Sequence, residues 1–200
     1  MKILALSDTH IPAFDSPEAA KLDKSDLKNF SFLSPILRHK IFEADLIVHA
    51  GDIESDDAYR IFLETGKLKA VRGNTDNDPL SSKLPEKLIF EEFGIKFGVV
   101  HEAGLSLDDN TARWYLLEEM DVDVLIYGHV HSPMIDEYKG KFLVCPGSPT
   151  RARLSEPTVA EIIIDEDKKE IEAIELVQVG QAACGAIKFY DELIGKSEKK

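Results

Sequence analysis

The chain has 200 residues, of which 44% are apolar and 30% are charged, and this composition is typical of a folded globular protein. Its formal net charge of −13 at pH 7 argues against the binding of long DNA or RNA, because contacts to many phosphates require clustered lysine and arginine. The same charge does not exclude a small phosphate-containing substrate, since bound divalent cations can reverse the local sign. No apolar run approaches the roughly 20 residues of a membrane span, so we expect no membrane partner.

The two cysteines, Cys145 and Cys184, show neither zinc-ligand spacing nor a disulfide framework. We interpret each as a buried free thiol and expect a cytoplasmic protein. The residues before Asp8 are too few for a signal peptide and instead predict a first strand.

The first half of the chain alternates short apolar runs with helical patterns. Strands are predicted at Ile3–Leu6, Asp45–Ala50 and Leu68–Val71. Apolar residues at helical spacing predict a helix from about Ser34 to Glu43, and a second helix is bounded by the cap Ser55 and the stop Gly66. A polar stretch from Pro12 to Asn29 separates the first strand from the first helix.

From Lys87 onward the pattern favours strands. They are predicted at Leu88–Phe93, Ile95–His101, Val122–Tyr127, Met134–Tyr138, Lys141–Cys145, Val159–Asp165 and Glu170–Val177, the first two antiparallel and the last four forming a meander. One helix is predicted at Leu107–Met120, with Asp108 and Asp109 at its positive end, and another at about Ala182–Leu193 before a frayed tail. With no repeat and no linker, residues 1–200 are predicted to form a single α/β domain whose core is 1–177.

Histidines, acids and one asparagine gather at the predicted strand ends. They are Asp8 and His10 after the first strand, Asp52 after the second, Asn74 after the third, His101 at the end of Ile95–His101, and His129 and His131 after Val122–Tyr127. Loops at the carboxyl ends of parallel strands meet at one edge of a sheet, so these side chains should converge. Imidazole and carboxylate ligands together favour Mn, Fe, Co, Ni or Zn. The sequence therefore predicts a site for two divalent transition metal ions, which a carboxylate such as Asp52 can bridge.

The motifs that contain these residues resemble those of the calcineurin-like metallophosphoesterase superfamily. In chain order they are Asp-x-His, Gly-Asp, Gly-Asn-x-Asp, a later His and Gly-His-x-His. The short chain, the Gly-Asn-Thr-Asp form and the segment Pro146-Gly147-Ser148 are similar to its small YfcE-like phosphodiesterase branch. The resemblance covers about Met1 to Val177 and implies a four-layer α/β/β/α sandwich with two mixed central sheets. It implies one ion held by Asp8, His10, Asp52 and His131 and a second held by Asp52, Asn74, His101 and His129, with Mn²⁺ first and Ni²⁺, Zn²⁺, Fe²⁺ or Co²⁺ as alternatives.

The implied activity is hydrolysis of a phosphate ester. Two ions about 3.5–4 Å apart lower the pKa of a shared water, which attacks phosphorus in line, so Asp52, Asn74 and His101 act through the metals and this water. Thr75 stands where many relatives have a histidine that resembles a general acid. Because threonine cannot donate a proton with a useful pKa, we expect a small phosphodiester, a nucleotide-like diester or an activated aryl ester as substrate.

Two other functions remain open at this stage. One is a catalytically weak scaffold of the same fold, similar to the protein-binding retromer subunit of this superfamily, and Thr75 and Glu102 keep it open. The other is a phosphomonoesterase, nucleotidase or nuclease. An exposed strand edge in the second half would also allow a homo-oligomer.

Several polar residues near the predicted ligands have two interpretations each. Glu102 is either a carboxylate at the mouth of the site or a solvated loop acid, and the second is favoured because exposed glutamate is the norm. His49 is favoured as a core histidine over a ligand, and Asp76 as a support of the metal cluster over a turn residue. Three arginines either contact a substrate phosphate or are ordinary solvated side chains, and the second is favoured for each: Arg72, Arg151 and Arg153.

Overall fold

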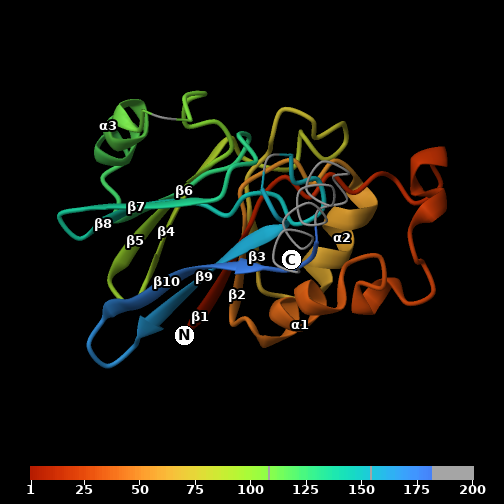
Figure 1. Cartoon of the computed structure of the whole chain (residues 1–200), viewed down its shortest axis with the longest axis horizontal. Coiled ribbons are helices and arrows are strands. Elements are labelled where there is room, and N and C mark those ends of the chain that lie inside the picture. The colour runs from red at the N-terminus through yellow and green to blue at the C-terminus, as the bar shows by residue number, and fades with distance from the viewer. Residues whose placement is uncertain (108, 154, 182–200) are drawn as a thin grey trace, which may run out of the picture.

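Two mixed sheets of five strands each form the centre of the structure (Figure 1). The computed structural model describes residues 1–107, 109–153 and 155–181. The first sheet has the order β10-β9-β1-β2-β3, in which the strands are β1 (Lys2–Leu6), β2 (Leu46–His49), β3 (Leu68–Ala70), β9 (Thr158–Asp165) and β10 (Glu170–Gln178). The second has the order β4-β5-β6-β8-β7, with β4 (Lys87–Glu92), β5 (Ile95–Val100), β6 (Val124–Ile126), β7 (Met134–Tyr138) and β8 (Lys141–Cys145).

The described residues form three α-helices and two short 3-10 helices. They are α1 (Pro35–Glu43), α2 (Asp56–Glu64), α3 (Thr111–Glu119), η1 (Pro17–Lys21) and η2 (Leu27–Asn29). The hydroxyl groups of Ser34 and Ser55 accept hydrogen bonds from Leu37 N and Ala58 N, so serine caps begin both α1 and α2. The sequence predicts the cap at Ser55, whereas for α1 it predicts a helix from about Ser34 without naming a cap. None of the helices in the described ranges is long and apolar enough to cross a membrane.

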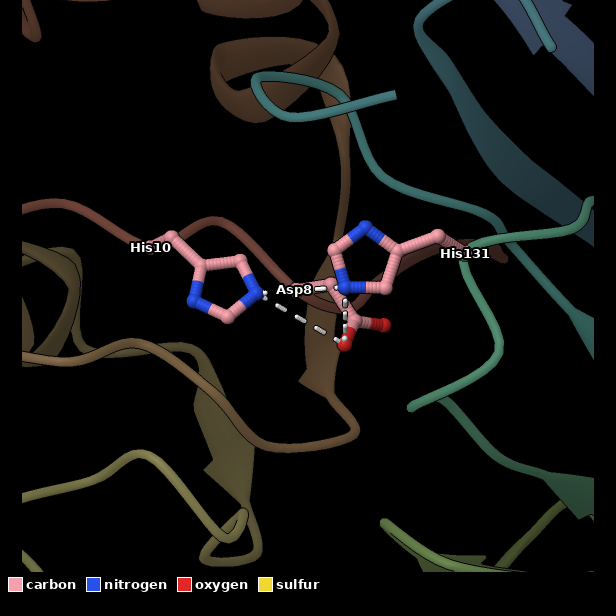
Figure 2. Close-up of side chains that lie close together, drawn as sticks. All are labelled: Asp8, His10 and His131. Atoms are coloured by element: carbon pink, nitrogen blue, oxygen red, sulfur yellow. Dashed lines mark hydrogen bonds and ion pairs between the residues drawn. The ribbon is translucent and has the colours of Figure 1, made fainter. Parts of the chain in front are cut away.

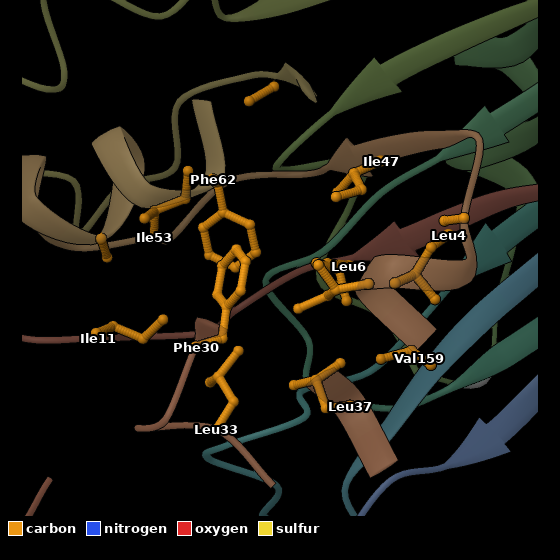
Figure 3. Packing of buried hydrophobic residues seen from close by; sticks show 14 of the residues in the cluster. Leu4, Leu6, Ile11, Phe30, Leu33, Leu37, Ile47, Ile53, Phe62 and Val159 are labelled. Atoms are coloured by element: carbon orange, nitrogen blue, oxygen red, sulfur yellow. The ribbon is translucent and has the colours of Figure 1, made fainter. Parts of the chain in front are cut away.

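Alternating side chains of the central strands separate the apolar core into layers. Leu4 and Leu6 of β1 pack against Leu37 of α1 and Phe62 of α2, on the helical side of the first sheet (Figure 3). Ile3 and Ala5 alternate with Leu4 and Leu6 along β1 and point to the opposite face. There they meet side chains of the second sheet.

The second sheet repeats this arrangement. Val124 and Ile126 of β6 face the first sheet, whereas Leu125 between them packs with Leu143 of β8 and Leu117 of α3. The layers are therefore helix, sheet, sheet and helix, and the predicted four-layer α/β/β/α sandwich with two mixed sheets is confirmed.

The predicted meander in the second half is wrong. β7 and β8 form an antiparallel pair in the second sheet, whereas β9 and β10 form one in the first, where β9 also pairs with β1. The segment between β8 and β9 crosses from one sheet to the other. Alternating polarity reports that a strand has one buried face and does not report which sheet the strand joins.

Helix α3 is shorter than predicted because its first turn is replaced by a capping loop. The side chain of Ser106 accepts a hydrogen bond from Asp109 N at 3.0 Å, and the Asp109 carboxylate accepts one from Thr111 N at 2.9 Å. These bonds engage the backbone donor of Asp109, which precedes the helix, and that of Thr111, the first helical residue, so the helix begins at Thr111 rather than at Leu107.

Three further features of the sequence have different outcomes. The polar stretch Pro12–Asn29 contains η1 and η2. Cys145 is a buried free thiol, as predicted, and burial raises its pKa to about 12. The predicted helix Ala182–Leu193, the tail and Cys184 lie outside the described residues.

Candidate metal centre

The seven predicted ligands lie in loops that directly follow five strands. Asp8 and His10 follow β1, Asp52 follows β2, Asn74 follows β3, His101 follows β5, and His129 and His131 follow β6. β1, β2 and β3 run parallel in one sheet, and β5 and β6 run parallel in the other. Their carboxyl ends therefore bring all five loops to one edge of the sandwich.

Three of these side chains form a first group of ligand atoms (Figure 2). Nε2 of His131 lies 3.2 Å from Oδ1 of Asp8 and 3.2 Å from Nε2 of His10, and the His10 nitrogen lies 4.0 Å from the same oxygen. All three residues are buried. Two imidazole nitrogens and one carboxylate oxygen thus point toward a common centre.

A second group lies on the other side of Asp52. Oδ1 of Asn74 is 2.9 Å from Nε2 of His101 and 2.9 Å from Nδ1 of His129. Oδ2 of Asp52 lies 3.3 Å from the His101 nitrogen and 3.7 Å from Nε2 of His10. One oxygen of Asp52 therefore borders both groups, as a bridging ligand requires.

Backbone carbonyl groups fix the tautomers of two of the histidines. Nδ1 of His101 lies 2.8 Å from the carbonyl oxygen of Ala50, and Nδ1 of His131 lies 2.9 Å from that of Arg151. A carbonyl oxygen only accepts, so each Nδ1 carries the hydrogen and donates it. In the neutral ring the Nε2 lone pair then points into the site, which is the arrangement that metal-binding histidines adopt.

The charges of the site favour a bound cation. Burial opposes ionisation of Asp8 and Asp52, but hydrogen bonds from His131 and His101 hold the pKa of each carboxyl below its usual range. Burial alone would lower the pKa of His101 and His131, yet the neighbouring carboxylates raise it. Ionised acids that stabilise positive charge on adjacent imidazoles will also stabilise a divalent cation, and the nitrogen-and-oxygen donor set fits a transition metal.

Two glycines allow the ligand loops to approach each other. A Cβ atom on Gly73 would lie 2.1 Å from Oδ1 of Asp52, and one on Gly128 would lie 1.8 Å from Oγ of Ser7 and 2.8 Å from Oδ2 of Asp8. Any side chain at either position would displace a predicted ligand.

Five of the predicted ligands have left-handed backbone conformations. Their φ angles are 54° for Asp8, 42° for His10, 58° for Asp52, 70° for His129 and 52° for His131. Residues other than glycine adopt this region at an energetic cost, and such residues concentrate at functional sites. The amino-acid sequence did not predict these conformations, because none of the five residues is glycine.

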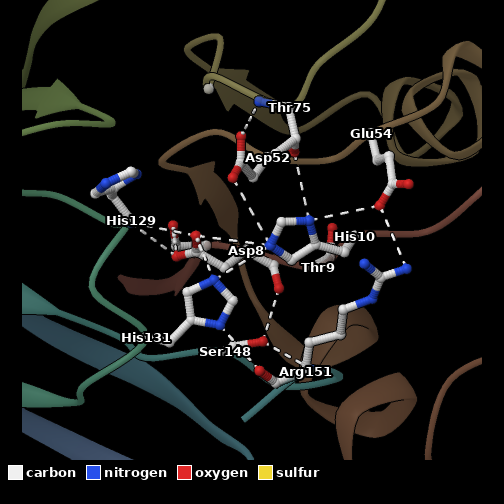
Figure 4. Close-up of polar contacts among 12 residues, drawn as sticks. Asp8, Thr9, His10, Asp52, Glu54, Thr75, His129, His131, Ser148 and Arg151 are labelled. Atoms are coloured by element: carbon white, nitrogen blue, oxygen red, sulfur yellow. Dashed lines mark hydrogen bonds and ion pairs between the residues drawn. The ribbon is translucent and has the colours of Figure 1, made fainter. Parts of the chain in front are cut away.

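Hydrogen bonds from neighbouring residues hold Asp8 and the loops around it (Figure 4). Oγ of Ser7 donates to Oδ2 of Asp8 at 2.6 Å, and Oγ of Ser148 donates to the Asp8 carbonyl oxygen at 2.7 Å. Asp76 accepts hydrogen bonds from the backbone N–H groups of Asp52, Glu54 and Gly73 at 3.2, 2.7 and 2.7 Å. Burial raises the pKa of Asp76, and its position behind the ligand loops agrees with the supporting role that the sequence suggested.

Glu54 is a polar neighbour of the site that sequence reasoning missed. Its Oε2 lies 3.5 Å from Nδ1 of His10 and 3.6 Å from Nη2 of Arg151. The only signal was its position two residues after Asp52, and an acid in a polar loop is too common to indicate a site.

His49 is a core residue, as favoured. It is fully buried, its Nε2 lies 3.1 Å from Oγ1 of Thr9, and burial lowers its pKa to about 3. Glu102, by contrast, is 56% exposed at its side chain and lies 3.9 Å from Nδ1 of His129, so it is a solvated loop acid that also borders the ligands.

Comparison with known proteins assigns the chain to a family. Residues 1–168 match the calcineurin-like phosphoesterase superfamily domain. The chain belongs to this superfamily. A curated relative, the "Probable metallophosphoesterase" of Methanothermobacter thermautotrophicus, is 32% identical over 195 residues, covering 94% of this chain and 99% of the relative. The chain is accordingly a probable metallophosphoesterase.

Two solved structures share the fold. Vps29 of Entamoeba histolytica, crystallised with Zn²⁺, has a TM-score of 0.62 at 22% identity, covering 90% of this chain and 99% of that one. A structure described as a novel archaeal phosphodiesterase has a TM-score of 0.60 at 21% identity, covering 88% of this chain and all of its own (100%).

Proposed function

We propose that this superfamily member is a dinuclear metal-dependent phosphodiesterase of the YfcE-like branch. The observation that carries the proposal is Asp52, whose Oδ2 lies between two groups of ligand atoms, 3.7 Å from Nε2 of His10 and 3.3 Å from Nε2 of His101. The fold is shared with an archaeal phosphodiesterase.

In this proposal each ion has four protein ligands. One ion is held by Asp8, His10, Asp52 and His131, and the other by Asp52, Asn74, His101 and His129. Manganese is the proposed ion, with nickel, zinc, iron and cobalt as alternatives that suit the same donor set. Bound together, two such ions supply an activated water near neutral pH and neutralise charge on the phosphate oxygens.

The position of Thr75 favours phosphodiesters over alkyl phosphomonoesters as the proposed substrates. Its N–H donates to Oδ1 of Asp52 at 2.8 Å and its Oγ1 lies 3.4 Å from Nδ1 of His10, so the residue stands beside the ligands. A threonine hydroxyl is too weak an acid to protonate an alkoxide leaving group. Esters whose leaving group departs as a stable anion, such as aryl diesters, are therefore the proposed substrates.

Basic side chains near the ligands would orient the substrate phosphate. A cavity of about 320 Å³ borders Asn74 and His101, and it is also lined by Arg72 and Lys87. Arg72 is ion-paired with Glu86, whereas the ammonium group of Lys87 makes no hydrogen bond or ion pair with the described part of the chain. The substrate proposed is a small phosphodiester or nucleotide-like molecule, because the net charge of −13 disfavours long nucleic acids.

A protein-binding scaffold is the second candidate function. Vps29, which shares the fold, is named for vacuolar protein sorting rather than for hydrolysis. Thr75 at the position of the usual acid and Glu102 at 3.9 Å from His129 would both weaken turnover of an anionic ester. This candidate predicts metal binding without hydrolysis.

The deciding experiment measures hydrolysis of bis(p-nitrophenyl) phosphate and p-nitrophenyl phosphate with Mn²⁺, Ni²⁺ or Zn²⁺. We expect metal-dependent turnover that is faster on the diester. Asp52→Asn should lower kcat/KM by more than about a hundredfold, beyond the effect usual for an outer-shell partner. Asp167→Asn, in an exposed turn, is the matched control and should retain full activity. Metal binding with no turnover of either ester would refute the proposal and support the scaffold.

A further inference from the structure

A second cavity, of about 190 Å³, lies on the other side of the ligand cluster. Its lining includes Thr9 and His10, the apolar side chains Leu22, Phe32 and Leu33, and the charged side chains Glu18 and Arg151. An apolar cavity of about 150 Å³ accommodates a benzene ring. The cavity beside His10 is therefore large enough for an aromatic group.

The apolar walls are held firmly by the core. The ring of Phe32 packs against those of Phe14 and Phe30 at centroid distances of 5.2 and 5.9 Å. Leu33 is buried, and its N–H donates to the carbonyl oxygen of Phe30 at 2.9 Å. Leu22 is the C-cap residue that follows η1, and its N–H donates a hydrogen bond to the carbonyl oxygen of Ala19. These contacts preserve the shape of the cavity in the absence of an occupant.

The polar rim of this cavity leads to the ligands. Arg151 lines it beside His10, and Figure 4 shows the guanidinium of Arg151 directed toward Glu54, which also lies beside His10. The backbone carbonyl of Arg151 accepts from His131, and its guanidinium approaches Glu54. A group attached to a phosphorus atom held between the two ligand groups therefore has a short path into the cavity.

The two cavities that border the ligands differ in chemistry. The one beside Asn74 and His101 is lined by four charged side chains, Arg72, Glu86, Lys87 and Glu102. The one beside His10 has apolar walls from Leu22, Phe32 and Leu33, with Glu18 and Arg151 also in its lining. A phosphodiester carries two substituents, and a site with two unlike cavities favours a diester with two unlike substituents.

We propose that the cavity formed by Leu22, Phe32 and Leu33 binds an apolar aromatic substituent on phosphorus, such as an aryl group or a nucleobase. The proposal rests on the phosphodiesterase function above and names the substrate class for it. Leu22, Pro12 and Glu18 of this lining belong to the polar stretch Pro12–Asn29, and Phe32 and Leu33 follow it. That segment thus forms part of the substrate site.

The test compares the binding of phenylphosphonate and methylphosphonate to the Mn²⁺-loaded protein by calorimetry. Both present the same phosphonate group to the metals and differ only in the substituent. We expect phenylphosphonate to bind about tenfold more tightly, a value within the range for one added apolar group in a protein pocket. Leu22→Ser should remove this preference, and Leu22→Met should keep it.

Leu27→Ser is the matched control, since Leu27 is also half-buried in this segment and does not line the cavity. Equal binding of the two phosphonates, or an unchanged preference in Leu22→Ser, would overturn the inference. In that case hydrolysis of bis(p-nitrophenyl) phosphate by the same samples would show that the proposed function stands. Absence of both phosphonate binding and turnover would overturn the two together.

Discussion

Acidification should destabilise the protein through His49 in particular. This histidine is fully buried and its ring lies edge-on to Phe62, with a centroid distance of 5.8 Å. Its Nε2 contacts Thr9, whereas its Nδ1 has no hydrogen-bond partner among the described residues. Burial therefore favours the neutral ring and lowers its pKa from 6.5 to about 3.

The sign of the effect follows from which state binds the proton. Between pH 6.5 and about 3 the unfolded chain protonates His49 and the folded chain does not. The unfolded state then binds more protons, so the free energy of unfolding decreases as the pH falls through this window. The contribution of His49 should be about 2 kcal/mol at pH 5, relative to neutral pH.

The assay is urea denaturation between pH 5 and 7.5 in the presence of EDTA, which excludes effects of metal release. His49→Gln should have a shallower pH dependence than the wild type, by about 2 kcal/mol over this range. His39→Gln, at an exposed histidine of α1, should retain the wild-type dependence. Parallel pH profiles for the wild type and His49→Gln would refute the reasoning.

Three further predictions concern the metal centre. Gly73→Ala should lower Mn²⁺ affinity by at least about tenfold in a calorimetric titration, because its Cβ would lie 2.1 Å from Oδ1 of Asp52; unchanged affinity would contradict this. Thr75→His should increase kcat for methyl p-nitrophenyl phosphate only slightly but increase turnover of dialkyl phosphates clearly, and no gain on the alkyl esters would count against the assigned role of this position. Mn²⁺ at about a hundred times its Kd should stabilise the wild type by about 2.7 kcal/mol for each bound ion in urea denaturation, and identical unfolding curves with and without Mn²⁺ would argue against a folded-state site.

The fold was predictable where a local pattern determines the structure. The spacing of apolar residues predicted α1, the cap Ser55 predicted the start of α2, and apolar runs predicted β1, β2 and β3. The assignment of hairpins to sheets was not predictable in this way. In both β7–β8 and β9–β10 two strand-forming runs are separated by a short turn, and only the pairing of β9 with β1 places the second hairpin in the first sheet.

The proximity of the seven candidate ligands was predictable because each follows a strand and carries a side chain of a metal-binding type. The structure brings these side chains close together, which agrees with that reasoning. The distances from Asp52 to His10 and to His101 show in addition that Asp52 borders two groups of side chains, which the sequence alone could not show. The contacts of Glu54 and Ser7 depend on loops with left-handed backbone at Asp8, Asp52 and Glu54. Such conformations at non-glycine residues are imposed by tertiary contacts and leave no signal in the local sequence.

The most direct test of the central claim is the anomalous X-ray diffraction of crystals grown with Mn²⁺. Two peaks about 3.5–4 Å apart are expected, as in other two-metal sites. One should lie among Asp8, His10 and His131, the second beside His101, and both next to Asp52. A single peak, or peaks away from Asp52, would contradict the account.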